Sequence, residues 1–150
     1  MFIFAKVIFM PIQFRNEKIR FELKKKSVLQ KWIFAVSGKE KKQIGELHFV
    51  FCNDEFLLKL NKKYLNHTSL TDIITFDYSS DKKLISEIYI SIPRVKENAK
   101  NFQTLFENEL HRVMIHGMLH LYGYKDKTKS QKEKIRKKEN DCLKLLNKII

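Results

Sequence analysis

The sequence predicts a single-domain α+β protein, in which a mixed central β-sheet is packed with helices. Segments typical of strands and segments typical of helices are mixed along the chain without strict alternation. The length of 150 residues and the apolar content of 43% suit one domain with one hydrophobic core. The chain contains no internal repeat, low-complexity tract or linker-like segment, so we expect residues 1–150 to form that one domain.

Several segments are expected to be β-strands. They are rich in β-branched and aromatic residues or alternate apolar with polar residues. Glycine or proline marks two of their ends, because Gly45 precedes the third segment and Pro93 follows the last. The expected strands are residues 2–9, 19–23, 46–52, 71–78 and 85–92.

The expected helices follow from apolar residues at helical spacing and from end signals. Gly38 is expected to close the first helix, and Asn53 or Asp54 to cap the second. Pro93 suits the first turn of the third helix, and Thr104 is expected to start the fourth. The expected helices are residues 25–37, 54–65, 93–99, 104–121 and 129–147.

The composition indicates the environment of the protein and the class of its partners. With 30 basic and 17 acidic residues, the net charge of +13 favours a polyanion such as RNA, DNA or an anionic membrane, and a merely solubilising surface is an equal alternative. No segment approaches the roughly 18 apolar residues of a membrane helix. Cys52 and Cys142 match no metal-ligand spacing, so we expect buried thiols in a cytoplasmic protein.

The segment HGMLHLYGYKD, residues 116–126, predicts a metal site at the C-terminal end of the fourth helix. His116 and His120 project about 40° apart on a helix, so their imidazoles can reach one cation. Gly123 suits the residue just beyond the helix, where a left-handed turn can bring Asp126 back toward them. Two histidines and a carboxylate are typical of a catalytic zinc site, and Mn²⁺ would also accept this set. For a bare HxxxH pattern, the alternative is a pair of surface histidines.

Gly117 lies near the middle of the apolar stripe of the same helix. A glycine inside a helix costs about 1 kcal/mol relative to alanine, so close approach of the helix to the sheet is the expected reason. A glutamate at this position, as in the HExxH metalloproteases, would point its charge into packed apolar surface. The pattern therefore disfavours a protease.

These motifs resemble the YbeY family of ribosomal-RNA-maturation endoribonucleases along most of the chain. The segment at 116–126 is similar to the family signature HGxLHLxGYxH, and SEIYISI is similar to a third, acidic-then-apolar stretch. A second family stretch is matched within LNKKYLNHTSLTDIITF at Asn61, Tyr64, Thr71 and Asp72.

The resemblance implies an α+β fold with a central sheet and a single-strand-specific, metal-dependent ribonuclease, usually with one zinc ion. It also implies action near the 3′ end of small-subunit ribosomal RNA and in ribosome quality control, with single-stranded RNA and the ribosomal small subunit or its precursors as partners. Three positions depart from the family pattern. Asp126 replaces the usual third histidine ligand, Leu65 replaces an arginine thought important for activity, and Ser86 replaces a glycine.

Other polar residues are weaker candidates for the site. Arg94 is a candidate catalytic residue that would stabilise charge on phosphate, although a surface arginine on the third helix is the simpler interpretation. His67 lies in a loop where it could contact phosphate or carry a proton. His48 and His111 are expected at the surface.

Two basic segments and one loop complete the candidate RNA surface. Residues 15–31 carry seven basic and two acidic residues, and residues 125–150 carry ten and four. The second segment could guide RNA toward the metal, although such runs are usually a solvated helix face. Thr71 and Asp72 would line the cleft or make a turn. The competing function is a non-catalytic, ribosome-associated RNA-binding module with a structural metal.

Overall fold

The computed structural model describes residues 10–66, 70–80 and 82–150, in which strands and helices are mixed along the chain. The expected α+β class is confirmed, and the strand expected at residues 2–9 lies outside the described residues. In chain order the elements are β1 (Ile12–Asn16), α1 (Lys26–Lys39), β2 (Gln43–Cys52), α2 (Asp54–Leu65), β3 (Ile73–Asp77), β4 (Lys83–Ser91), α3 (Ile92–Asn101), α4 (Phe106–Leu121) and α5 (Lys129–Ile149).

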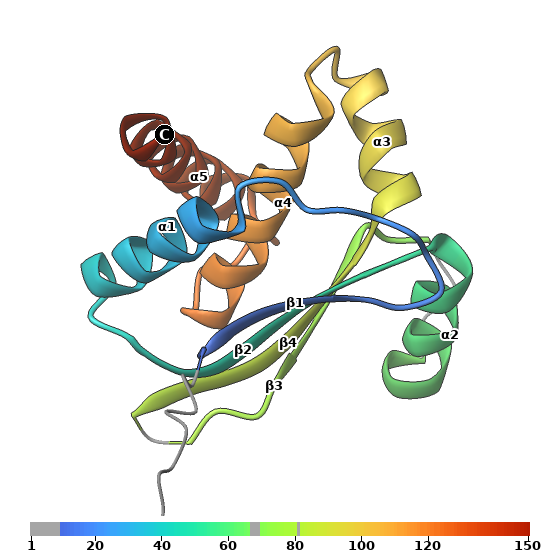
Figure 1. Ribbon diagram of the computed structural model, residues 1–150, viewed down its shortest axis with the longest axis horizontal. Helices are drawn as coiled ribbons and strands as arrows, with labels where there is room; N and C mark the ends of the chain where they lie inside the picture. Colours follow the sequence, from blue (N-terminus) through green and yellow to red (C-terminus); the bar gives the residue numbers. More distant parts are fainter. Residues whose placement is uncertain (1–9, 67–69, 81) are drawn as a thin grey trace, which may run out of the picture.

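The four strands form one mixed sheet in the order β1-β2-β4-β3 (Figure 1). β1 pairs with β2 and β2 with β4 in parallel, whereas β3 runs antiparallel to β4. A parallel pair needs a long crossover, and α1 supplies it between β1 and β2. The expected mixed central sheet is therefore present.

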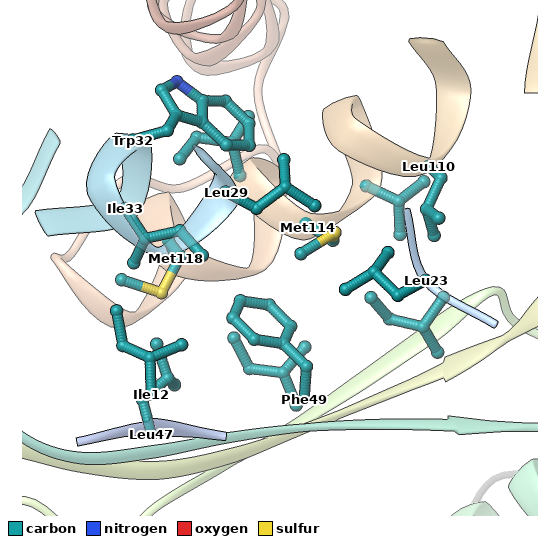
Figure 2. Close-up of a cluster of buried hydrophobic side chains, with 14 of the residues drawn as sticks. Ile12, Leu23, Leu29, Trp32, Ile33, Leu47, Phe49, Leu110, Met114 and Met118 are labelled. Carbon is teal, nitrogen blue, oxygen red and sulfur yellow. The ribbon is translucent and has the colours of Figure 1, made fainter. Parts of the chain in front are cut away.

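The main hydrophobic core lies between one face of the sheet and helices α1, α4 and α5. Figure 2 shows Leu29 of α1, Met114 of α4 and Phe49 of β2 meeting in this layer. Trp32 is fully buried, and its Nε1–H donates to the carbonyl of Cys142 in α5 over 2.7 Å. α2 contributes to a second, smaller cluster, which also contains Cys52 and Ile74 of the sheet. The large core holds α4 and α5 against each other and thereby fixes the elements that carry the candidate site.

The strand expected at residues 19–23 is wrong, because these residues are irregular and have no ladder partner within the described part of the chain. The segment covers the end of the core instead, with Phe21 packed edge-on against Phe51 and Phe106. The alternating apolar pattern therefore reflects packing of an irregular segment. The actual edge strand β1 was not expected, since it follows Pro11 and offers few apolar residues.

Several predicted element ends differ from the structure, and at three of them the expected end signal lies elsewhere. α1 continues to Lys39, and Lys41 takes the left-handed conformation that we expected of Gly38. Gly45 lies within β2, at an irregularity in the pairing with β4, where an added Cβ would meet Lys83 Cβ at 3.1 Å. α4 begins at Phe106 rather than at Thr104. These ends are set by backbone geometry and by strand pairing, which composition does not encode.

Candidate metal centre

Close packing of α4 on the sheet sets the orientation of the two candidate histidines. An added Cβ at Gly117 would lie 2.7 Å from Ile73 Cδ1 and 3.3 Å from Ile88 Cγ2, so the glycine allows the approach that we expected. His116 and His120 then lie beside the packed stripe, with 26% and 31% of their side chains exposed. Their imidazoles are thus anchored on a rigid helix and still reachable from solvent.

The end of α4 turns the chain back toward these histidines. Gly123 has φ +99°, its N–H donates to the His120 carbonyl, and the N–H of Tyr124 donates to the Leu119 carbonyl, both over 3.0 Å. This pair of bonds is a Schellman motif, as expected for a glycine just beyond a helix. The turn brings Asp126 beside the imidazole rings.

The three predicted ligands converge. His116 Nε2 and His120 Nε2 are 2.9 Å apart, and Asp126 Oδ2 lies 3.5 Å from the first and 3.1 Å from the second. One ligand atom from each of these three residues lies within 4.8 Å of the other two. Among the described histidines, cysteines and acids, this is the group that is close enough together to hold one metal ion.

The outer nitrogens of both histidines have acceptors, which fixes the tautomers. His120 Nδ1–H donates to the carbonyl of Tyr124 over 2.9 Å, and His116 Nδ1–H donates to Glu139 Oε2 over 2.6 Å. Because the outer nitrogens hold the protons, both Nε2 lone pairs point at the same place as the Asp126 carboxylate. Metal-binding histidines are held in this way by carbonyl and carboxylate partners. The donor set therefore fits a divalent ion.

Glu139 of α5 is the acidic partner behind this site. Its side chain is only 4% exposed, and its second oxygen accepts from Arg112 Nη1 over 3.0 Å. Burial acts to raise the pKa of Glu139, but the hydrogen bonds from His116 and Arg112 outweigh it and lower the pKa. Burial lowers the pKa of His116, but the hydrogen bond and charge of Glu139 reverse this effect and raise it. An incoming cation must therefore compete with a proton at His116 as the pH falls.

An open cavity of about 360 Å³ adjoins the ligands. It lies along α4 and α5 and reaches Asp72 before β3 and Asn98 of α3. Asn98 Nδ2–H donates to Asp72 over 3.3 Å, while burial raises the pKa of Asp72 and also that of Glu109. The cavity is lined by Asp72, Asn98, Phe102, Glu109, Arg112, Val113, His116, Asp126, Lys132, Ile135, Arg136 and Glu139.

Comparison with known proteins identifies the family of this fold and site. The family described as Endoribonuclease YbeY matches residues 11–147. The chain belongs to the YbeY family. The YbeY endoribonuclease of Flavobacterium psychrophilum is 47% identical over 132 residues, which cover 88% of this chain and 94% of that protein. The one from Karelsulcia muelleri is 50% identical over 129 residues, covering 86% and 92%.

A solved structure supports the same fold. The solution structure of TM1509 from Thermotoga maritima matches with a TM-score of 0.55 and 29% identity, covering 91% of this chain and 92% of that one. The resemblance to YbeY is thus confirmed, and with it the expected enzyme class, an RNA-cleaving hydrolase. Within the described part of the chain, the helices are too short or too polar to cross a membrane.

The weaker candidates, Arg94, His48 and His111, lie outside the group of metal ligands. Arg94 Nη2 donates to Asp54 Oδ2 over 2.8 Å, and Arg94 does not line the cavity. His48 lies on the sheet and is hydrogen-bonded to Glu46 over 2.8 Å. His111, expected at the surface, is half-buried, with one edge of its ring packed against Trp32. His67 lies outside the described residues.

Of the two other stretches similar to the YbeY family, the second reaches the cavity through Asp72, and no residue of SEIYISI lines it. Thr71 Oγ1–H donates to the carbonyl of Ile73, which is the expected turn role, and Asp72 lines the cavity. Leu65 ends α2 with 44% exposure, and Ser86 is buried with its hydroxyl donating to the carbonyl of Phe76. Because residue 65 is a leucine, its side chain carries no positive charge.

Three residues of the site were not expected from the sequence: Arg112, Arg136 and Glu139. The only available signal for Glu139 was an acid on the apolar side of α5, between Ile135 and Cys142. An acid at such a position predicts a buried partner, but its identity requires the α4–α5 packing.

Proposed function

We propose that this chain is a zinc-dependent endoribonuclease that cuts single-stranded RNA during ribosome maturation. The observation that carries the proposal is the convergence of two Nε2 lone pairs and one carboxylate at the wall of an open cavity. His116, His120 and Asp126 would hold the ion. When bound, a divalent ion lowers the pKa of a coordinated water and polarises a phosphoryl oxygen. The domain with this activity spans residues 1–150 and acts in the cytoplasm.

The protein side chains determine how that chemistry is supported. Glu139 and the Tyr124 carbonyl hold the imidazoles in the tautomer that donates Nε2 lone pairs. Asp126 adds a negative charge that a third histidine would not bring, so the site accepts a harder ion such as Mn²⁺ besides zinc. By family analogy, the substrate is ribosomal RNA near the 3′ end of the small-subunit RNA, and the partner is the small subunit or its precursors.

The alternative of a structural metal in a non-catalytic RNA-binding module has less support. Structural zinc sites usually have four protein ligands, whereas the described residues bring three together beside a cavity. The protease alternative is also disfavoured, because the side of α4 at Gly117 is packed against Ile73 and Ile88.

Elemental analysis and RNA cleavage test the proposal together. The purified protein should carry about one zinc or manganese ion per chain and cut a single-stranded oligoribonucleotide. His120→Ala should lose both the ion and cleavage, while His48→Gln, which removes a histidine outside the site, should keep both. Full cleavage by His120→Ala would show that the metal site is misassigned. Stoichiometric metal without cleavage would favour the RNA-binding module.

A further inference from the structure

Two arginines lie beside the metal centre and share one acceptor. Arg112 Nη1 of α4 and Arg136 Nη1 of α5 approach the same oxygen of Glu139, over 3.0 and 3.5 Å. A guanidinium carries five N–H donors, and Glu139 accepts one from Arg112 and forms an ion pair with Arg136. Both arginines line the cavity, and their side chains are 24% and 59% exposed. Donors therefore remain available on the cavity side.

One buried carboxylate fixes these arginines relative to the metal ligands. Oε1 of Glu139 accepts from Arg112 and forms an ion pair with Arg136, and Oε2 accepts from His116. The guanidinium groups are thus held one side chain away from an imidazole that binds the ion. A group bound by the arginines would lie next to the group bound by the metal.

The charge of the cavity wall permits an anion at this place. Among the described residues, four carboxyl groups line the cavity, but Asp126 faces the histidines, and Glu139 already accepts from His116 and Arg112 and pairs with Arg136. The other two are Asp72, which accepts from Asn98 Nδ2–H over 3.3 Å, and Glu109. Lys132, one turn before Arg136 on α5, adds a third cation to the same wall.

Arg94 offers a contrast, because two of its N–H donors are bound to a single carboxylate. Its Nε and Nη2 donate to the two oxygens of Asp54, over 3.4 and 2.8 Å. A guanidinium in a two-point ion pair has its carboxylate-facing edge blocked. Arg112 and Arg136 instead share one acceptor and face the cavity.

We propose that Arg112 and Arg136 form a phosphate-binding subsite that holds the RNA backbone beside the metal centre. The inference rests on the proposed ribonuclease function and deepens it by naming the residues that bind the strand. Guanidinium groups suit this task, because their planar donors match two phosphate oxygens at once. Arg136 is the residue to test, since it is mostly exposed and its loss leaves the contact between Glu139 and His116 intact.

The test measures binding of a single-stranded 2′-O-methyl oligonucleotide to the zinc-loaded protein by fluorescence anisotropy over a range of salt concentrations. Arg136→Gln should weaken binding about tenfold and flatten the salt slope by about 0.7, the value of one phosphate contact on a single strand. The affinity of Arg136→Lys for the oligonucleotide should lie between those of the unmodified protein and Arg136→Gln, because lysine keeps the charge but cannot contact two phosphate oxygens in a plane. Lys137→Gln, which removes one charge from the neighbouring position outside the cavity, should bind within twofold of the unmodified protein. Zinc content should be equal in all four proteins.

The outcomes separate this inference from the proposed function. Equal losses of oligonucleotide affinity for Arg136→Gln and Lys137→Gln would overturn the subsite, because the loss would then reflect the lower net charge of the protein and not the position of Arg136. The subsite would also be overturned if inorganic phosphate displaced the oligonucleotide with an equal dissociation constant, since the site would then bind a free anion rather than an RNA backbone. If the unmodified protein cuts RNA but Arg136→Gln binds normally, the subsite fails and the ribonuclease proposal stands. If the unmodified protein neither binds nor cuts RNA, both fail.

Discussion

Replacing Glu139 by glutamine should weaken metal binding without removing any proposed ligand. The carboxylate accepts from His116 Nδ1–H with one oxygen and from Arg112 with the other. A glutamine amide has one acceptor oxygen, so its NH₂ group must face one of these two donors. If it faces Arg112, two buried donors meet and stability falls by about 1–3 kcal/mol. If it faces His116, the tautomer needed for metal binding is disfavoured.

The second orientation acts on the ion through the tautomer of His116, whereas the first keeps that hydrogen bond and removes only the negative charge behind the imidazole. Loss of such a partner typically weakens metal affinity 10- to 100-fold, which equals about 1.4–2.7 kcal/mol. Competition with a chromophoric zinc chelator measures the dissociation constant, and the rise in Tm on adding zinc should shrink accordingly. Glu133→Gln is the matched control, since Glu133 is exposed on the same helix and does not line the cavity. A zinc affinity of Glu139→Gln within threefold of the unmodified protein would refute the reasoning.

The remaining predictions concern the third ligand Asp126, the half-buried His111 and the contact of α4 with the sheet at Gly117. Asp126→His should keep a stoichiometric ion whereas Asp126→Ala should bind it at least tenfold more weakly, as elemental analysis and chelator competition would show. Burial lowers the pKa of His111 below 6.5 in the folded state, so the unfolded chain binds the proton more readily. The contribution of His111 to stability should therefore be lost as the pH drops below about 6.5, so urea titrations should show a smaller loss of stability on acidification for His111→Gln than for the unmodified protein. Equal pH dependence of the two proteins would contradict this prediction. Gly117→Glu should reduce the free energy of unfolding by about 3 kcal/mol or more, because it buries a charge against Ile73. Gly38→Ala, whose added Cβ meets nothing within 4 Å, should be neutral or stabilising in the same unfolding assay.

The fold class could be predicted because it depends on local periodicity, and the errors arose where long-range pairing decides. The segments around β2, β4, α2 and α5 have strong apolar spacing and clear end signals, and the structure contains each of them. Residues 19–23 have the same alternation, but the strand ladder ends when the N–H of Glu17 donates to the carbonyl of Phe51. Beyond that point the apolar side chains of residues 19–23 still pack on the core, but their backbone pairs with no strand of the described sheet. Periodicity indicates which side chains are buried, and it does not indicate which backbone they pair with.

The metal ligands could be predicted for a related reason, since all three lie within eleven residues. The helix sets the angle between His116 and His120, and a glycine with positive φ sets the return to Asp126. Glu139 is 23 positions from His116, so its contact depends on how α5 crosses α4. Composition indicated a basic segment here, but only the packing shows that Arg136 faces the cavity.

The packing at Gly117 also separates this site from metalloproteases with a similar histidine spacing. Two histidines four residues apart fix the angle between the ligands, but they do not fix which side of the helix faces the sheet. In this chain position 117 faces Ile73 and Ile88, so a carboxylate there could not reach a metal-bound water. The carboxylate behind His116 comes instead from α5, and the same carboxylate holds the cavity arginines. The arrangement therefore directs positive charge at the group beside the metal, which suits an anionic phosphodiester better than a neutral peptide.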